Sequence, residues 1–136
     1  MTPTILVATT LQHLSLVSSL KIRNYRLTCR TSGIEALAYL RERTPDLMIL
    51  DGELSGMSGL DICYRAKKVS RLRHIPVILL LSGKDTERRQ IEATLVGAER
   101  ALHHPVSGLE LCRAIEGLLQ KVSPRTAPEV RIPYVA

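Results

Sequence analysis

The segment "PDLMILDGELSGMSG", residues 45–59, joins a run of four apolar residues to a single carboxylate, Asp51. Three glycines then follow within eight residues, and they give the next segment the freedom of a loop. A short uninterrupted apolar run is typical of a central strand of a parallel sheet, covered on both faces. Because this strand ends on an acid and opens into a flexible loop, Asp51 is the first candidate functional residue.

Apolar runs of strand length alternate with helical patterns along the rest of the chain. The expected strands are residues 4–8, 25–29, 47–50, 76–81 and 101–103. This alternation predicts β-α units around a parallel sheet. The second run alternates in polarity and favours an edge strand, whereas the third and fourth are continuous and favour central strands.

Between the expected strands, apolar side chains recur every three or four positions, as they do in amphipathic helices. The five stripes are Leu11, Leu14, Val17 and Leu20; Ile34, Leu37 and Leu40 or Arg41; Leu60, Cys63, Ala66 and Val69; Ile91, Leu95 and Val96; and Leu109, Cys112, Ile115, Leu119 and Val122. We expect each stripe to lie on the sheet. In a doubly wound sheet the functional groups gather at the carboxyl ends of the strands, so Thr9, Thr10, Ser82 and His104 should surround Asp51.

The composition limits the classes of function. At 136 residues the chain is expected to form one domain, residues 1–122, followed by a proline-rich tail or linker, residues 123–136. The longest apolar run, residues 77–81, is far shorter than the ~18 residues that a membrane span requires. Without Trp or Phe, the chain offers no aromatic cluster for stacking nucleic-acid bases. The three cysteines have neither disulfide nor zinc-ligand spacing, which indicates reduced thiols and a cytoplasmic location.

The net charge of +6 is the one unusual bulk property. Part of it lies in "RAKKVSRLR", which contains five basic residues and no acid: Arg65, Lys67, Lys68, Arg71 and Arg73. A solvated helix face explains such a run. A surface for phosphates or for an acidic partner is the alternative.

Four motifs make the chain similar to a bacterial response-regulator receiver domain of two-component signalling. They are "PDLMILD", "SGMSGLDIC", "IPVILLL" and "GAERALHHPV", and the likeness covers roughly residues 4–121. The resemblance implies a flavodoxin-like, doubly wound parallel sheet of five strands in the order 2-1-3-4-5, with five helices. In this family an aspartate accepts a phosphoryl group while Mg²⁺ neutralises the phosphoryl oxygens. Asp51 falls on the acceptor position.

The resemblance also implies that most of the phosphoryl-transfer machinery is missing. The divergent positions are Thr9 and Thr10 for an acidic pair, Leu81 for a hydroxyl (with Ser82 one place late), Ala101 for an aromatic switch residue, and His104 for the lysine before Pro105. Only Asp51 and the backbone at Glu53 match the chemical pattern. The match at "HHPV" further implies a cis peptide before the proline.

Two side chains are candidates to replace the missing groups. Glu53 either turns inward as a substitute carboxylate or points to solvent at the rim. His104 is either a cation whose pKa is raised by Asp51 or a neutral ring hydrogen-bonded to Asp51 or a neighbouring threonine. A zinc site made by His103, His104 and Asp51 is not favoured, because adjacent residues on a strand point to opposite faces.

These losses favour a degenerate receiver, or pseudo-receiver, that works as a largely phosphorylation-independent protein-interaction module and not as an enzyme. We expect it to bind a regulatory protein or a second copy through the surface of the fourth helix, fifth strand and fifth helix. The alternative is a functional phosphoacceptor, phosphorylated on Asp51 by a histidine kinase with compensating metal ligands; only this alternative calls for Mg²⁺. A sensor of a small ligand or anion is a further alternative. No contact with a membrane is expected, and nucleic acid would be bound only through a separate output domain.

Overall fold

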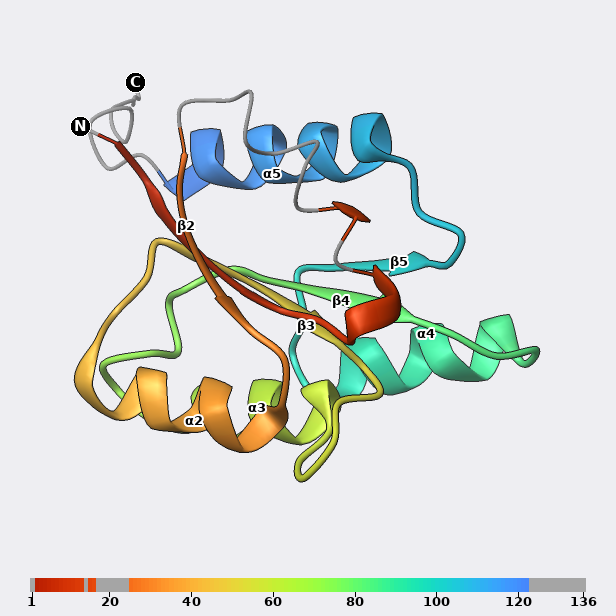
Figure 1. Ribbon diagram of the computed structural model, residues 1–136, viewed down its shortest axis with the longest axis horizontal. Coiled ribbons are helices and arrows are strands. Elements are labelled where there is room, and N and C mark those ends of the chain that lie inside the picture. The colour runs from red at the N-terminus through yellow and green to blue at the C-terminus, as the bar shows by residue number, and fades with distance from the viewer. Residues whose placement is uncertain (1, 14, 17–24, 123–136) are drawn as a thin grey trace, which may run out of the picture.

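The computed structural model describes residues 2–13, 15–16 and 25–122 (Figure 1). Five parallel strands form one sheet in the order β2-β1-β3-β4-β5, which confirms the predicted order. The strands are β1 (Thr4–Ala8), β2 (Arg26–Arg30), β3 (Leu47–Asp51), β4 (Val77–Leu81) and β5 (Arg100–His103). The second strand lies at an edge, and the third and fourth lie inside the sheet, as their patterns of polarity predict.

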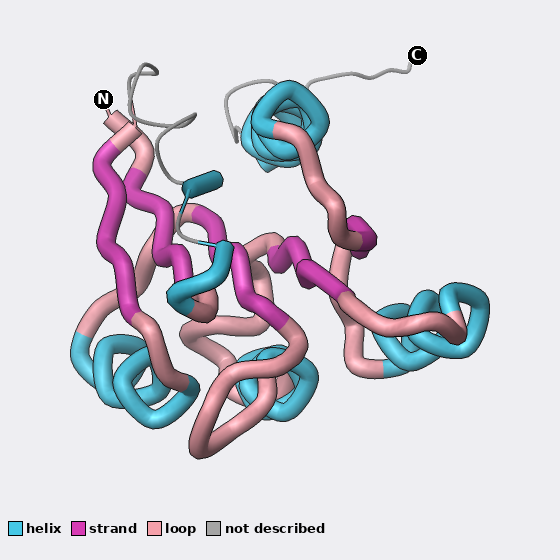
Figure 2. The backbone as a smooth tube through the Cα atoms, turned by 45° about the vertical axis from the view of Figure 1, so that its right-hand side comes forward, coloured by secondary structure: helices cyan, strands magenta, loops and turns pink. Residues whose placement is uncertain are grey.

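Helices connect the strands and cover both faces of the sheet. The described helices are the 3-10 helix η1 (Leu11–His13), α2 (Gly33–Glu42), α3 (Gly59–Ala66), α4 (Thr86–Leu95) and α5 (Gly108–Val122). Helices α2, α3 and α4 lie on one face, and α5 lies on the other (Figures 1 and 2). Most of the first predicted stripe, including Leu14, Val17 and Leu20, falls outside the described residues, as does the tail from residue 123. None of the described helices has both the length and the apolar character needed to cross a membrane.

The core is aliphatic and is divided between the two faces of the sheet. Along β4, Leu79 and Leu81 pack toward α2, α3 and α4, whereas Ile78 and Leu80 pack toward α5. All four side chains are fully buried. Successive side chains of β4 point to opposite faces of the sheet, and both faces are covered by helices. All of these side chains are therefore apolar, and the sequence of the strand is a continuous apolar run.

Of the apolar stripe predicted for helix α4, Val96 packs against the core, but Ile91 and Leu95 do not, so the prediction is wrong for these two residues. Ile91 and Leu95 are 60% and 77% exposed, and Ala93 is the buried residue of the helix. The helix sequence is short and mostly polar, and Ala93 within it and Val96 at its end make the contact with the core. The other exposed members of the predicted stripes lie at or beyond the ends of helices: Leu11, Ile34, Val69 and Leu109.

The end of β3 is held by close packing against the start of α3. A Cβ atom on Gly59, the first residue of α3, would lie 2.2 Å from the carbonyl oxygen of Asp51, so only glycine permits this approach. The preceding residue, Ser58, caps α3 by accepting the backbone N–H of Asp61 at 3.1 Å. The position of the Asp51 backbone therefore depends on the helix that follows it.

Candidate functional site

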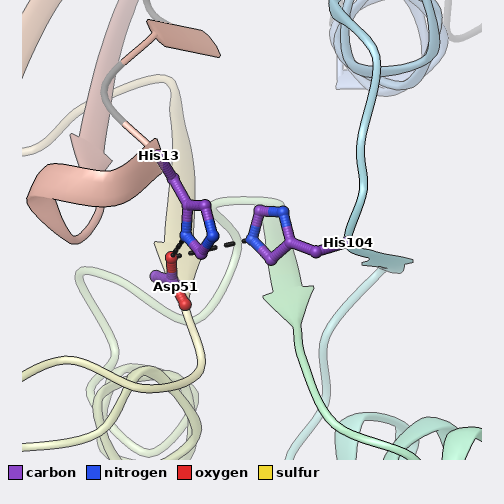
Figure 3. A group of neighbouring side chains, drawn as sticks. All are labelled: His13, Asp51 and His104. Atoms are coloured by element: carbon purple, nitrogen blue, oxygen red, sulfur yellow. Dashed lines mark hydrogen bonds and ion pairs between the residues drawn. The ribbon is translucent and has the colours of Figure 1, made fainter.

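Asp51 lies at the carboxyl end of the central strand β3, and its side chain is fully buried. Its Oδ1 accepts the backbone N–H of Glu53 at 3.3 Å. Its Oδ2 lies 2.6 Å from Nδ1 of His13, which is the donor because a carboxylate only accepts (Figure 3). Thr10 Oγ1 lies 3.2 Å from the same nitrogen. A buried carboxylate requires such partners, and His13 is the principal one.

His104 approaches the same carboxylate from the segment after β5. Its Nε2 lies 3.7 Å from Asp51 Oδ2, too far for a hydrogen bond, and this buried atom has no hydrogen-bond partner among the described residues. The His104 ring stacks on the His13 ring, with 3.5 Å between centroids and 17° between planes (Figure 3). The peptide between His104 and Pro105 is cis, as the resemblance implies.

Burial lowers the pKa of His104, and the neighbouring His13 lowers it further, while Asp51 acts in the opposite direction. Burial dominates because taking the imidazolium out of water disfavours its charge. Of the two alternatives for His104, the cation with a raised pKa is therefore wrong. The neutral ring is favoured, but without the hydrogen bond that the sequence analysis assigned to it.

The remaining positions of the predicted pocket carry neutral or apolar groups. Thr9 follows β1 at the same edge of the sheet as Asp51; it is buried, and its Oγ1 has no hydrogen-bond partner within the described part of the chain. Leu81 is fully buried in the core cluster that faces α2, α3 and α4, and Ala101 packs against that cluster. Ser82 is half-buried. Apolar packing thus occupies the two positions where the resemblance calls for a hydroxyl and an aromatic ring.

Glu53 lies at the rim and does not turn toward Asp51. Its side chain is 63% exposed, and its Oε2 lies 3.6 Å from Arg89 Nη2 on α4. Mg²⁺ prefers oxygen ligands and is usually anchored by one or two carboxylates. Here the described pocket offers one carboxylate, with a histidine nitrogen 2.6 Å from one of its oxygens, and threonine hydroxyls. This donor set does not fit magnesium.

Two of the five residues of the predicted basic surface are engaged by groups of the protein itself. Lys67 Nζ donates to two backbone carbonyls of the loop before β4, at 3.0 and 3.3 Å, and pairs with Glu99 at 2.9 Å. Arg71 donates to backbone carbonyls at the end of α2. Arg71 is nevertheless exposed, as are Arg65, Lys68 and Arg73, and Lys67 is half-buried. Any basic surface here is therefore smaller than the sequence suggests.

His13 is the functional-site residue that the sequence analysis missed. In the sequence it lies between Leu11 and Leu14, and nothing in that apolar stripe marks it as a site residue. The available signal was topological, because the segment after β1 begins at the same edge of the sheet as the end of β3. A histidine four residues after Thr9 can therefore reach Asp51.

The comparisons with known proteins agree with this fold. The profile of the response regulator receiver domain matches residues 9–116. The phosphate regulon transcriptional regulatory protein PhoB of Rhizobium meliloti is 31% identical over 107 residues, 78% of this chain and 46% of that protein. The chain spans less than half the length of the curated relatives it matches.

Two solved structures have the same architecture. The signal receiver domain of a signal transduction histidine kinase from Syntrophus aciditrophicus is 27% identical, with a TM-score of 0.81 over 96% of this chain and 99% of that one. A CheY-like response regulator receiver domain protein from Methanospirillum hungatei is 19% identical, with a TM-score of 0.81 over 93% and 100%. The chain belongs to the response regulator receiver domain family of two-component signalling.

Proposed function

We propose that this receiver domain acts as a protein-interaction module whose state is largely independent of phosphorylation at Asp51. The observation that carries the proposal is the 2.6 Å contact between Asp51 Oδ2 and His13 Nδ1. A carboxylate attacks phosphorus through an oxygen lone pair, with a metal ion on the phosphoryl oxygens. Here one oxygen is engaged by His13 and the other by the Glu53 N–H. The nucleophile is therefore held in a resting contact that phosphoryl transfer would have to break.

The charges around Asp51 also support the proposal. Thr9 and Thr10 supply no negative charge to anchor a cation, and His104 favours its neutral form, so it is a poor replacement for a lysine. Loss of a metal ion removes several kcal/mol of transition-state stabilisation. Since each 1.36 kcal/mol is about tenfold in rate, phosphorylation is expected to be slower by orders of magnitude.

The groups that would report phosphorylation are absent as well. Leu81 has no hydroxyl to draw toward a phosphoryl group, and Ala101 has no ring to follow it. A ligand shifts a conformational equilibrium only through different contacts with the two states. A phosphoryl group on Asp51 would make neither contact, so it would have little effect on the distant surface.

We propose that the partner binds to the surface formed by α4, β5 and α5. Ile91 and Leu95 extend from α4 into solvent, and Ile91 lines an open hollow of about 340 Å³ together with Thr86, Glu87 and Gln90. Neighbouring exposed apolar side chains of this size mark contact surfaces in soluble domains. We propose that a regulatory protein or a second copy of the chain covers them.

Phosphodonor labelling tests the proposal. The purified chain is incubated with Mg²⁺ and acetyl phosphate, and its intact mass is measured; backbone NMR shifts are followed with Mg²⁺ and beryllofluoride. We expect no added phosphoryl group and no saturable shifts around Asp51. Mg²⁺-dependent labelling that is lost in Asp51→Asn would overturn the proposal.

A variant with the missing groups restored provides the positive control. It carries four substitutions: Thr9→Asp, Thr10→Asp, Leu81→Thr and His104→Lys. The added carboxylates and cation should give it Mg²⁺-dependent beryllofluoride binding that the parent chain lacks. If the parent chain were labelled at the same rate as this variant, the natural residues at these four positions would not limit phosphorylation of Asp51.

A working phosphoacceptor is the second candidate function. It is favoured by Asp51 itself and by the Glu53 N–H that orients its carboxylate. Glu53 is mostly exposed and only loosely paired with Arg89, so rotation of its side chain would bring a second carboxylate toward the pocket. Under this alternative the labelling is lost in Glu53→Gln as well as in Asp51→Asn.

A further inference from the structure

We propose that His13, Asp51 and His104 form a binding site for a divalent transition-metal ion of the zinc type. His13 Nδ1, Asp51 Oδ2 and His104 Nε2 all lie within 4.8 Å of one another (Figure 3). The three residues come from separate segments: η1, the end of β3 and the loop after β5. The inference goes beyond the proposed function and does not rest on it, because it concerns these ligand atoms whether or not Asp51 is phosphorylated.

The hydrogen bonding of the two rings is incomplete in a way that points to a cation. Asp51 Oδ2 is 2.6 Å from His13 but 3.7 Å from His104, so one oxygen serves only one of the two nitrogens. His104 Nε2 is buried and has no hydrogen-bond partner in the described ranges. Buried polar atoms are nearly always satisfied, and an unpaired one needs an explanation. A metal ion between the three atoms would accept a lone pair from each of them.

The two distances that involve Asp51 require adjustments of less than about 1 Å, and the two histidine nitrogens lie within 4.8 Å of each other. Zinc binds imidazole nitrogen and carboxylate oxygen at about 2.0–2.2 Å in tetrahedral geometry, which places neighbouring ligand atoms about 3.3 Å apart. The contact between Asp51 and His13 would lengthen by about 0.7 Å, and that between Asp51 and His104 would shorten by about 0.4 Å. The stacked rings would also tilt apart, because their planes differ by only 17° and the lone pairs must converge on one point.

The donor set selects the class of metal. Two imidazoles and one carboxylate suit Zn²⁺ and its transition-metal neighbours, whereas Mg²⁺ favours carboxylate, carbonyl and water oxygens. On binding, the His13 proton moves from Nδ1 to Nε2 by exchange with solvent, because the nitrogen that coordinates must offer a free lone pair and the ring stays neutral. The second oxygen of Asp51 keeps its bond to the Glu53 N–H, which fixes the orientation of the carboxylate.

A fourth coordination position would face solvent. The two histidines border an open cavity of about 400 Å³ that is also lined by Ser15, Leu16, Pro105 and Val106. The side chains of His13 and His104 are 23% and 13% exposed, so an ion can enter from this side. Three protein ligands with one open position is the arrangement in which zinc also holds a water or an incoming ligand atom.

Zinc titration by calorimetry tests the proposal. The chain is prepared without a histidine tag, stripped with EDTA, and carries Cys29→Ser because the exposed Cys29 side chain is an alternative zinc ligand. We expect one ion per chain. Replacement of His13 or His104 by glutamine should weaken binding at least about 100-fold, since loss of an outer-shell partner alone costs 10–100-fold. The matched control is His74→Gln, which removes an exposed histidine outside the cluster and should leave binding unchanged.

Cobalt provides a spectroscopic readout that a purely structural role would not change. Co²⁺ should give visible d–d absorption that is displaced by Zn²⁺, is unaffected by millimolar Mg²⁺, and is absent in His13→Gln and His104→Gln. Far-UV circular dichroism in EDTA establishes that these variants fold. Equal zinc affinity in the parent chain and in a variant that carries both His13→Gln and His104→Gln would overturn the site, as would an equal loss of affinity in His74→Gln. Neither result bears on phosphodonor labelling, so failure of this site is distinguishable from failure of the proposed function.

Discussion

The contact between His13 and Asp51 leads to a quantitative prediction for stability. His13→Ala leaves a fully buried carboxylate that, within the described residues, accepts one hydrogen bond, from the Glu53 N–H at 3.3 Å. A hydrogen bond to a charged group contributes about 1.5–3 kcal/mol. Since the His13 side chain is 23% exposed, water can partly replace it, and we expect the lower half of this range, about 1.5–2 kcal/mol. For a domain of this size that loss corresponds to a fall in Tm of about 5–10 °C.

A double-mutant cycle isolates the pair. Urea unfolding is followed by far-UV circular dichroism at pH 7.5 in EDTA for the parent chain, His13→Ala, Asp51→Asn and the double variant. In the Asp51→Asn background no buried charge remains, so His13→Ala should lower the free energy of unfolding by less than about 0.5 kcal/mol. The coupling between the two residues should therefore be about 1–1.5 kcal/mol.

The exposed His74 supplies the control for the loss of a histidine as such. His74→Ala should change the free energy of unfolding by no more than about 0.5 kcal/mol, as is usual for surface substitutions. A coupling between His13 and Asp51 below about 0.3 kcal/mol would refute the reasoning, because distant and independent sites are additive within that error. In that case the 2.6 Å contact would have no energetic significance.

Three further perturbations have expected outcomes. Burial raises the pKa of the Cys63 thiol to about 11, so iodoacetamide at pH 8 should label the exposed Cys29 well before Cys63. The stability that the protonated Cys63 thiol contributes should be complete below its unfolded pKa of 9.0 and lost as the pH rises toward about 11. Urea unfolding at a series of alkaline pH values measures this loss. Lys67→Met should lower the free energy of unfolding by about 1–2 kcal/mol, because two carbonyls and Glu99 lose a common donor; an unchanged urea midpoint would contradict this. Leu95→Glu should weaken self-association or partner binding at least about 10-fold in analytical ultracentrifugation while changing stability by less than about 0.5 kcal/mol; equal loss of stability would make Leu95 a core residue.

The central strands and the position of Asp51 could be predicted from the apolar pattern, whereas the full strand order is implied by the resemblance to the receiver family. The apolar runs that contain Ile49 and Leu79 are short, continuous and followed by loop residues, and a parallel sheet covered on both faces accounts for all three properties. Asp51 follows one of these runs directly, so its place at the functional edge follows from the topology.

The partners of Asp51 could not be predicted in the same way. His13 reaches the site through the path of a loop, and loop paths depend on local contacts rather than on a periodic pattern. The pKa of His104 depended on the balance between burial and a neighbouring charge, and only three-dimensional packing decides which of these is larger.

Helix α4 shows the limit of periodicity as evidence. The spacing of Ile91 and Leu95 defines a common face, but it does not say whether that face meets the sheet or a partner. Ala93 makes the contact with the core, and nothing in its residue type distinguishes it from a surface alanine. The two larger residues stay exposed, and they lie on the helix that the sequence analysis already includes in the interaction surface.

The contacts that Lys67 and Arg71 make within the protein reduce the number of basic side chains that are available to bind a polyanion. Both cations are already coordinated by carbonyl groups of their own fold, and Lys67 also by Glu99. A nucleic acid or an anionic surface would have to break these contacts before Lys67 and Arg71 could pair with its charges and release counterions. The salt dependence of such binding should therefore correspond to fewer released counterions than the number of basic residues suggests. The difference between the two numbers would give the number of basic side chains whose charge is already engaged within the fold.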